Sequence, residues 1–122
     1  MKSVKPCYFV GSSKRVISTM PPDVKSSFGL AFYFAQMGGE ADHVKALKGF
    51  GGRGVLEVIE HHDGNTFRAI YTVRFSTGVY VLHAFQKKSK SGIATPKHEM
   101  ELVATRLKDA DTLHRHHLQG GN

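Results

Sequence analysis

The sequence has almost no cysteine and no long apolar run. Cys7 is the only cysteine among 122 residues, so no internal disulfide can form. No stretch is long and apolar enough to span a bilayer, and no secretory apolar region follows Met1. These absences favour a cytoplasmic protein with no membrane partner, because structural disulfides are typical of oxidising compartments.

Acidic residues are also few. Aspartate and glutamate number 10 against 17 lysines and arginines, which gives a net charge of +7 with eight histidines in addition. A positive field concentrates phosphate polymers near the surface, and salt weakens it, so an anionic partner such as nucleic acid is indicated. A merely soluble basic protein is the competing interpretation. The 40% hydrophobic and 22% charged residues are typical of a globular chain, and we expect one domain over residues 1–122.

The N-terminal third predicts a short strand and two helices. Residues 5–10 are apolar and precede a glycine, which is typical of a strand, and residues 12–20 predict one or two helical turns. A proline pair at 21–22 begins a longer helix, which a glycine pair at 38–39 ends. Apolar residues at intervals of three and four predict one core-facing stripe on this helix: Val24, Phe28, Ala31, Phe32 and Ala35.

The middle of the chain predicts a sheet. Segments 55–62, 66–75 and 79–85 are rich in β-branched and aromatic residues, as strands are. Turn sequences at 63–65 and 76–78 join them, which predicts an antiparallel meander. The expected class is α+β, with an antiparallel sheet covered on one face by N-terminal helices and followed by a C-terminal helix.

The remaining segments complete this plan. Residues 40–54 predict a connector that could include one short helical turn, and their glycines lack the spacing of a nucleotide-binding loop, so no cofactor is expected. Thr95 as N-cap and Pro96 at the first helical position predict the last helix. The polar segment from about 111 to 122 has no apolar periodicity and predicts a frayed tail.

Arg68 is the first candidate functional residue. Strand alternation places Arg68 on one face of the second predicted strand, opposite the face of Phe67. An arginine in that position either pairs with a carboxylate, for which Glu57 or Glu60 would serve, or faces a solvated cleft. The residues alone leave both interpretations open, with the ion pair slightly favoured.

A basic pair follows the third predicted strand. If the strand continues, Lys87 shares a face with His83 and Phe85, while Lys88 shares the other face with Leu82 and Gln86. Together with Arg68, this face would hold a guanidinium, an imidazole and an ammonium group. Such groups can grip a phosphodiester, stabilise charge on its oxygens and move protons, as RNA cleavage through the 2′-hydroxyl requires. A solvated basic run is the competing explanation.

The remaining histidines and the cysteine predict no site. His114, His116 and His117 are close in sequence, but no cysteine or carboxylate cluster completes a zinc site, so no metal is expected. His61 and His62 face opposite sides of a strand. Cys7 lies in an apolar strand and is interpreted as a packing residue rather than a nucleophile.

The order and spacing of several short motifs resemble the phage-derived, HigB-like toxins within the RelE/ParE toxin–antitoxin superfamily. The similarity covers nearly the whole chain, and each motif is unspecific when taken alone. The motifs are Val10-Gly11-Ser12-Ser13, Met20-Pro21, Ala35-Gln36-Met37-Gly38, Leu47-Lys48-Gly49-Phe50-Gly51, Val55-Leu56-Glu57-Val58, Phe67-Arg68-Ala69-Ile70-Tyr71, Leu82-His83-Ala84-Phe85-Gln86-Lys87-Lys88-Ser89 and Thr95-Pro96.

The resemblance implies a small RelE-like fold in which the face of the sheet opposite the N-terminal helices receives RNA. The implied activity is metal-independent cleavage of mRNA in the ribosomal A site, which inhibits translation. The implied partner, besides mRNA on the ribosome, is a helix-turn-helix antitoxin. Arg68 matches the family's mid-strand arginine and is expected to stabilise the phosphate and the transition state, and Lys87 and Lys88 match its basic pair, as phosphate contacts or proton movers. His83 is a further catalytic candidate, although the resemblance transfers no acid–base pair to it. Lys45, Lys48 and Arg53 are interpreted as outer RNA contacts.

Two other functions stay open at this point. A ParE-like toxin has a similar fold but binds DNA gyrase and cuts no RNA, and the basic cluster disfavours it. A DNA-binding or adaptor protein would rest on charge alone, and the sequence has no clear helix-turn-helix signature.

Overall fold

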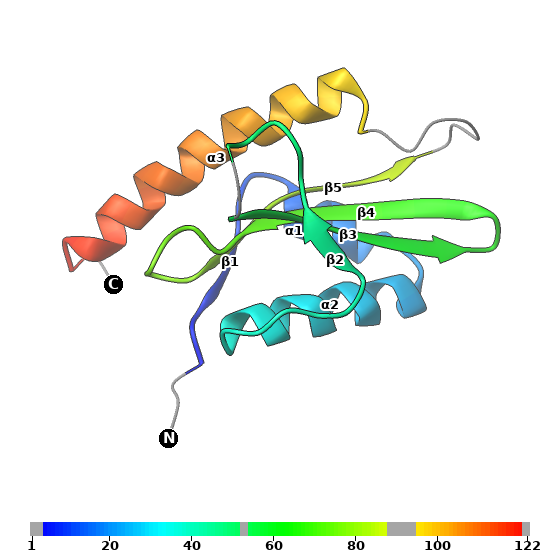
Figure 1. The fold of residues 1–122 in the computed structure, drawn as a ribbon, viewed down its shortest axis with the longest axis horizontal. Helices are drawn as coiled ribbons and strands as arrows, with labels where there is room; N and C mark the ends of the chain where they lie inside the picture. The colour runs from blue at the N-terminus through cyan, green and yellow to red at the C-terminus, as the bar shows by residue number, and fades with distance from the viewer. Residues whose placement is uncertain (1–3, 52–53, 88–94, 121–122) are drawn as a thin grey trace.

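The chain forms one five-stranded sheet with helices on both sides (Figure 1). The computed structural model describes residues 4–51, 54–87 and 95–120. Its elements in chain order are β1 (Cys7–Phe9), α1 (Ser13–Ser18), α2 (Pro22–Gln36), β2 (Val44–Ala46), β3 (Val55–His62), β4 (Asn65–Thr72), β5 (Val79–Lys87) and α3 (Lys97–Leu118). The strand order is β1-β5-β4-β3-β2, and β3, β4 and β5 are antiparallel neighbours. The α+β class and the central meander are confirmed.

The two edge strands depart from the expected plan. β1 pairs with β5 in parallel, so the sheet is mixed and not wholly antiparallel. Backbone contact there is close, since a Cβ on Gly78 would lie 2.8 Å from the carbonyl oxygen of Pro6. β2 pairs antiparallel with β3 inside residues 40–54, where a connector was predicted. That prediction was wrong because a three-residue edge strand is stabilised by pairing with β3, which local sequence does not encode.

Of the two predicted turns in the meander, one lies where it was predicted and the other is longer than predicted. Asp63 and Gly64 form the two-residue loop between β3 and β4, and both have positive φ, at 50° and 79°. This is the geometry of a primed hairpin turn, which the glycine permits. β4 ends at Thr72 and not at residue 75, because the Thr72 hydroxyl and the Val73 amide both donate to the carbonyl of Gly54. The β4–β5 connection is therefore longer than the predicted turn.

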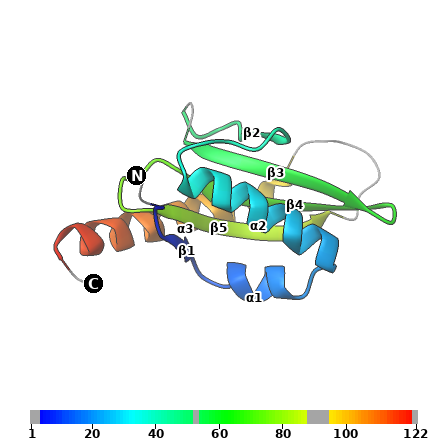
Figure 2. The same ribbon diagram turned by 90° about the horizontal axis from the view of Figure 1, so that it is seen from below.

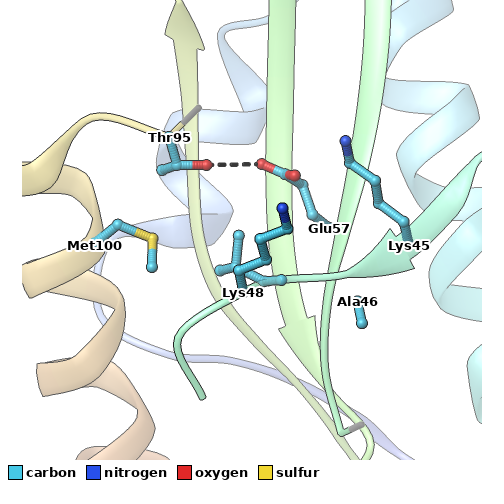
Figure 3. Close-up of a pocket in the computed structure, with 7 residues that line it drawn as sticks. Lys45, Ala46, Lys48, Glu57, Thr95 and Met100 are labelled. Carbon is cyan, nitrogen blue, oxygen red and sulfur yellow. Dashed lines mark hydrogen bonds between the residues drawn. The ribbon is translucent and has the colours of Figure 1, made fainter. Parts of the chain in front are cut away.

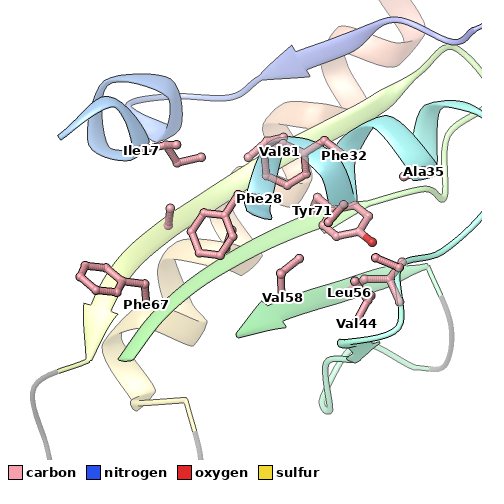
Figure 4. Close-up of a cluster of buried hydrophobic side chains, with 14 of the residues drawn as sticks. Ile17, Phe28, Phe32, Ala35, Val44, Leu56, Val58, Phe67, Tyr71 and Val81 are labelled. Carbon is pink, nitrogen blue, oxygen red and sulfur yellow. The ribbon is translucent and has the colours of Figure 1, made fainter. Parts of the chain in front are cut away.

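α2 covers one face of the sheet and forms the larger core (Figure 4). Phe28 and Ala31 are fully buried, and Phe32 packs edge-on against Tyr71 with ring centroids 5.5 Å apart. The predicted stripe on this helix is confirmed, since all five of its residues are buried. Cys7 packs at the margin of the core, and burial raises the pKa of its thiol to about 11, which suppresses the reactive thiolate.

α3 covers the opposite face, so the sheet lies between α2 and α3 (Figures 1 and 2). The prediction of a frayed tail from about residue 111 was wrong, because α3 continues to Leu118. The His114 ring stacks on Phe75 at 4.9 Å, and the His117 ring stacks on Tyr8 at 4.4 Å. Histidine rings supply the packing that apolar residues usually provide, so hydrophobic periodicity did not detect it. No helix among the described residues is long and apolar enough to cross a membrane.

Candidate functional site

A β-bulge in β5 determines which side chains share the α3-facing surface of the sheet. Tyr71 pairs with Val81 and Ile70 with His83, so Leu82 is an extra residue in β5. Strict alternation would place His83 on the face of Val81, beneath α2. The bulge moves His83 to the α3 side, so it shares the face of Phe85 and Lys87 as predicted. Leu82 lies on that face too, although counting back from Lys87 assigns it to the other one.

Arg106 of α3 holds this bulge in place. Its Nη1 donates to the carbonyl oxygen of Leu82 at 2.9 Å, and its Nη2 donates to Ser12 Oγ at 3.1 Å. The guanidinium thereby satisfies the backbone acceptor of the bulged residue and ties α3 to the start of α1. Arg106 was not among the predicted site residues, since nothing in its local sequence reveals a bulge 24 positions earlier.

A buried ion pair lies at the centre of this surface. Arg68 Nη1 donates to Glu57 Oε2 at 2.9 Å, and the two side chains are only 4% and 3% exposed. Thr95 Oγ1 also donates to Glu57 Oε2, at 3.0 Å. The predicted pairing of Arg68 with a glutamate is therefore found, with Glu57 and not Glu60 as the partner.

Thr95 has a different role from the predicted one. Pro96, not Thr95, is the N-cap of α3, and no side chain caps the helix. The Thr95 hydroxyl is instead used in the bond to Glu57, a residue 38 positions away in sequence. A buried carboxylate with a charged partner and a hydroxyl donor gains more from this bond than an exposed helix end would.

An imidazole–carboxylate pair lies beside the ion pair. His83 Nε2 is 2.6 Å from Glu99 Oε1, and His83 stacks on Phe85 with ring centroids 5.4 Å apart. The other nitrogen, His83 Nδ1, is buried and has no hydrogen-bond partner among the described residues. Glu99 was missed from sequence because it appeared only as an acid in a first helical turn, and α3 is what brings it onto β5.

A pocket of about 280 Å³ lies beside Glu57 of the ion pair (Figure 3). Glu57 and Thr95, which are joined by their hydrogen bond, line it together with Lys45 and Lys48. Lys45 is the register partner of Glu57 through the β2–β3 pairing, which explains its position. The other residues that line the pocket are Ala46, Leu47 and Met100.

The rest of the predicted set is only partly placed. Lys87 ends β5 on the α3 side, pairs with Thr66 of β4 and is 8% exposed. Lys88 and Arg53 lie outside the described residues. The structure therefore brings Arg68, His83 and Lys87 to one face, with Lys45 and Lys48 at the adjoining pocket. Among the described residues, no group of three or more histidine, cysteine or acidic side chains is arranged to hold a metal.

This surface can do three chemical things. The lysines and the Arg68 guanidinium can bind and stabilise phosphate oxygens. The His83–Glu99 pair can accept or donate a proton. The pocket offers room for part of a polymeric ligand next to both.

Comparison with known proteins identifies a family. The model of a family described as phage-derived protein Gp49-like matches residues 15–108. No curated protein and no solved structure matches significantly. The match includes β2 to β5 and the first half of α3, and with them every described residue of the ion pair, the imidazole pair and the pocket.

Proposed function

Because the chain belongs to the phage-derived Gp49-like family, a RelE-like toxin–antitoxin family, we propose that it is the toxin of a type II toxin–antitoxin pair and cleaves mRNA on the ribosome. The observation that carries this proposal is the α3-facing cluster, in which Arg68, His83 and Glu99 adjoin a lysine-lined pocket. An antitoxin is the proposed protein partner, and the cytoplasm, where ribosomes translate, is the proposed place of action.

The proposed reaction uses the nucleophile within the substrate. The RNA 2′-hydroxyl loses its proton and attacks the adjacent phosphorus, so a P–O2′ bond forms while the P–O5′ bond breaks. The 5′-oxygen leaves with a proton, and no oxidant, cofactor or metal enters this balance. The protein has to align the phosphate, stabilise its added negative charge and move two protons.

Each group of the cluster fits one of these tasks. Lys45 and Lys48 bind backbone phosphates at the pocket, and Arg68 stabilises charge on the scissile phosphate. His83 moves protons through Nε2, and Glu99 orients its ring through the 2.6 Å contact with that nitrogen. Lys87 adds positive charge at the end of β5, and Lys88 and Arg53, which lie outside the described residues, are proposed from sequence as further phosphate contacts.

Glu57 gives Arg68 its position. The carboxylate and the Thr95 hydroxyl hold the guanidinium within a buried network, so its direction is set before substrate arrives. A scissile phosphate then competes with Glu57 for the same donors. Arg68 is in this proposal a catalytic residue, and Glu57 and Thr95 are positioning residues.

One observation favours a different function. A 4% exposed arginine in a buried ion pair is also what a purely structural residue looks like, and a ParE-like toxin that binds DNA gyrase would need no catalytic cluster. In that case the basic surface would serve only for binding.

Controlled expression separates the two functions. Under the proposal, translation stops and primer extension shows new 5′ ends within translated messages, and these ends disappear when the start codon of the message is removed. Intact transcripts together with accumulating gyrase-linked DNA breaks would instead establish the binding toxin. Two variants serve as controls in the same assay. Arg106→Gln, which removes the bond to the bulge beside His83, should reduce cleavage, whereas Leu118→Ser, a change on the exposed surface, should leave it at the parent level.

A further inference from the structure

The outer face of α2 carries an exposed apolar stripe. Leu30 is 50% exposed, Tyr33 47%, Met37 41% and Phe34 39%. Their spacing is i, i+3, i+4 and i+7, so the four side chains lie on one side of the helix. The stripe faces away from the sheet, because the inward side of α2 is occupied by Phe28, Ala31, Phe32 and the other buried residues of the core.

The stripe is more apolar than a solvated helix face requires. Between Lys25 and Glu40 the sequence contains no charged residue, although a surface helix ordinarily carries charges opposite its core stripe. A contiguous group of large exposed apolar side chains on one protein surface marks an interaction site. Apolar anchors at this spacing are also the pattern by which one helix recognises another.

A hollow adjoins the C-terminal end of α2. It has a volume of about 530 Å³, and its lining includes Gly38 and Gly39, which follow Met37 directly. Val73, which is 39% exposed, adds apolar surface to it. The remaining lining residues are Lys5, Ala35, Glu40 and Leu56. A large side chain of a partner lying on the stripe could be anchored there.

The two edges of the stripe differ in charge. On the β1 side, Lys5 is joined to the end of α2 by two hydrogen bonds with Gln36, and Lys14 lies over the Phe9 ring at 5.9 Å. Lys25 precedes Gln36 by eleven residues, about three helical turns, so it lies on that same side of α2. On the β3 side, Glu60 accepts a hydrogen bond from Ser27 and pairs with His43 at 3.0 Å. The lysine edge is therefore open to an anionic partner, whereas the carboxylate of the other edge is already engaged.

A second copy of this chain fits the stripe poorly. Leu30 to Met37 spans about 11 Å of helix, whereas a stable interface buries about 800 Å² on each partner. A two-fold dimer would also bring two chains of charge +7 together along their lysine edges. Both the length and the charge favour a single short helix from another protein.

We propose that the outer face of α2 docks one amphipathic helix of a partner protein, whose apolar residues cover Leu30 to Met37 and whose acidic residues line the edge facing β1. This site lies on the opposite side of the sheet from the pocket, since α2 and α3 cover different faces (Figure 2). Docking is therefore independent of the RNA-binding surface proposed above.

A displayed library of helical peptides tests the partner chemistry. The library fixes leucine at i, i+3 and i+7 and randomises the flanking positions among acidic, basic and neutral residues. We expect selection on the full chain to enrich aspartate and glutamate along one edge. An absence of selected peptides, or enrichment of basic flanks, would overturn the proposal.

Variants then locate the binding. The dissociation constant of a selected peptide, measured by fluorescence anisotropy, should rise about tenfold or more for Leu30→Ser/Tyr33→Ser, as loss of central apolar anchors does. It should also rise for Lys25→Glu. The matched controls Leu118→Ser and Lys108→Glu, which change an exposed leucine and an exposed lysine on α3, should bind as the parent does. Equal loss in the controls, or no loss in the α2 variants, would place the peptide elsewhere.

Two further measurements distinguish the remaining outcomes. Sedimentation should show a monomer at tens of micromolar, and a dimer that Leu30→Ser/Tyr33→Ser dissociates would assign the stripe to a second copy and overturn the proposal. Circular dichroism should show that the double variant folds. In the mRNA cleavage assay this variant should retain the parent activity, so that failure of the docking site and failure of the proposed nuclease are recognised separately.

Discussion

The face of the sheet beneath α2 and the face beneath α3 bury different kinds of side chain. Beneath α2 the contacts are almost wholly apolar, as with Phe28 and Val58, both fully buried. Beneath α3 the surface is divided. One half is apolar, around Ile70 and Val103, and the other holds the Glu57–Arg68 pair.

The two faces therefore contribute differently to the stability of the fold. Apolar burial contributes about 25 cal/mol per Å², whereas a buried ion pair roughly offsets its own desolvation cost. Glu57, Arg68, His83 and Lys87 occupy positions where apolar residues would stabilise the fold at least as well. We infer that α2 and its face maintain the fold, while the polar half of the α3 face is retained for function.

The largest expected effect is on the apolar face. Phe28→Ala should lower the free energy of unfolding by about 3–5 kcal/mol, because it removes a fully buried ring and leaves a cavity. Leu30→Ala on the same helix, which changes a half-exposed side chain, should cost less than about 1 kcal/mol. Urea denaturation of both variants checks the contrast, and equal losses would show that α2 is not packed as described.

The next largest effect is expected for Glu57→Ala, which should lower the free energy of unfolding by about 3 kcal/mol, because it leaves the Arg68 guanidinium buried without its carboxylate. Glu57→Gln retains an acceptor for Thr95 and should cost less. Thermal unfolding of the two variants measures this. If Glu57→Ala were as stable as the parent, the ion pair would have to be solvated and not buried.

Arg106→Gln tests the bulge that brings His83 to the site. Loss of the bond to the Leu82 carbonyl should cost about 1–3 kcal/mol, the range for a buried acceptor deprived of its donor. Cleavage should fall more than stability alone explains, because the His83 ring would lose its placement. Amide hydrogen exchange at Leu82 and His83 should accelerate, whereas exchange in β3 should stay at the parent rate.

The smallest effect on stability is expected at the pocket lysines. Lys45→Ala/Lys48→Ala should change the unfolding free energy by less than about 0.5 kcal/mol, because both side chains are exposed. The same variant should reduce the salt dependence of RNA binding by about 1.4 in the slope of log K against log salt concentration, at about 0.7 for each lost phosphate contact. Lys108→Ala is the matched control. An unchanged slope would remove both lysines from the RNA contacts.

The parts of the fold that local sequence encodes were predictable. The α2 stripe follows from apolar spacing along one helix, and the β3–β4 hairpin follows from Asp63-Gly64 between two β-rich segments. Both depend on residues close together in the chain. β2 and the C-terminal half of α3 were missed because each depends on partners far away, β3 for the former and the Tyr8 and Phe75 rings for the latter.

The candidate site shows the same limit. Arg68 and its glutamate partner were foreseeable from charge and strand alternation, although the choice between Glu57 and Glu60 was not. Glu99 and Arg106 were invisible, because only the packing of α3 on β5 gives them roles. The bulge at Leu82 explains why simple alternation assigns that residue to the wrong face.

We propose that the buried polar half of the α3 face cleaves RNA. The most direct test of this proposal is single-turnover cleavage of a translated message by the double variant Glu57→Leu/Arg68→Met, which replaces the ion pair with apolar side chains of similar size. The melting temperature should be close to or above that of the parent, and ribosome binding should be maintained. The cleavage rate should be lower by about a hundredfold or more. Cleavage at the parent rate by this folded variant would show that the Glu57–Arg68 pair has no part in cleavage.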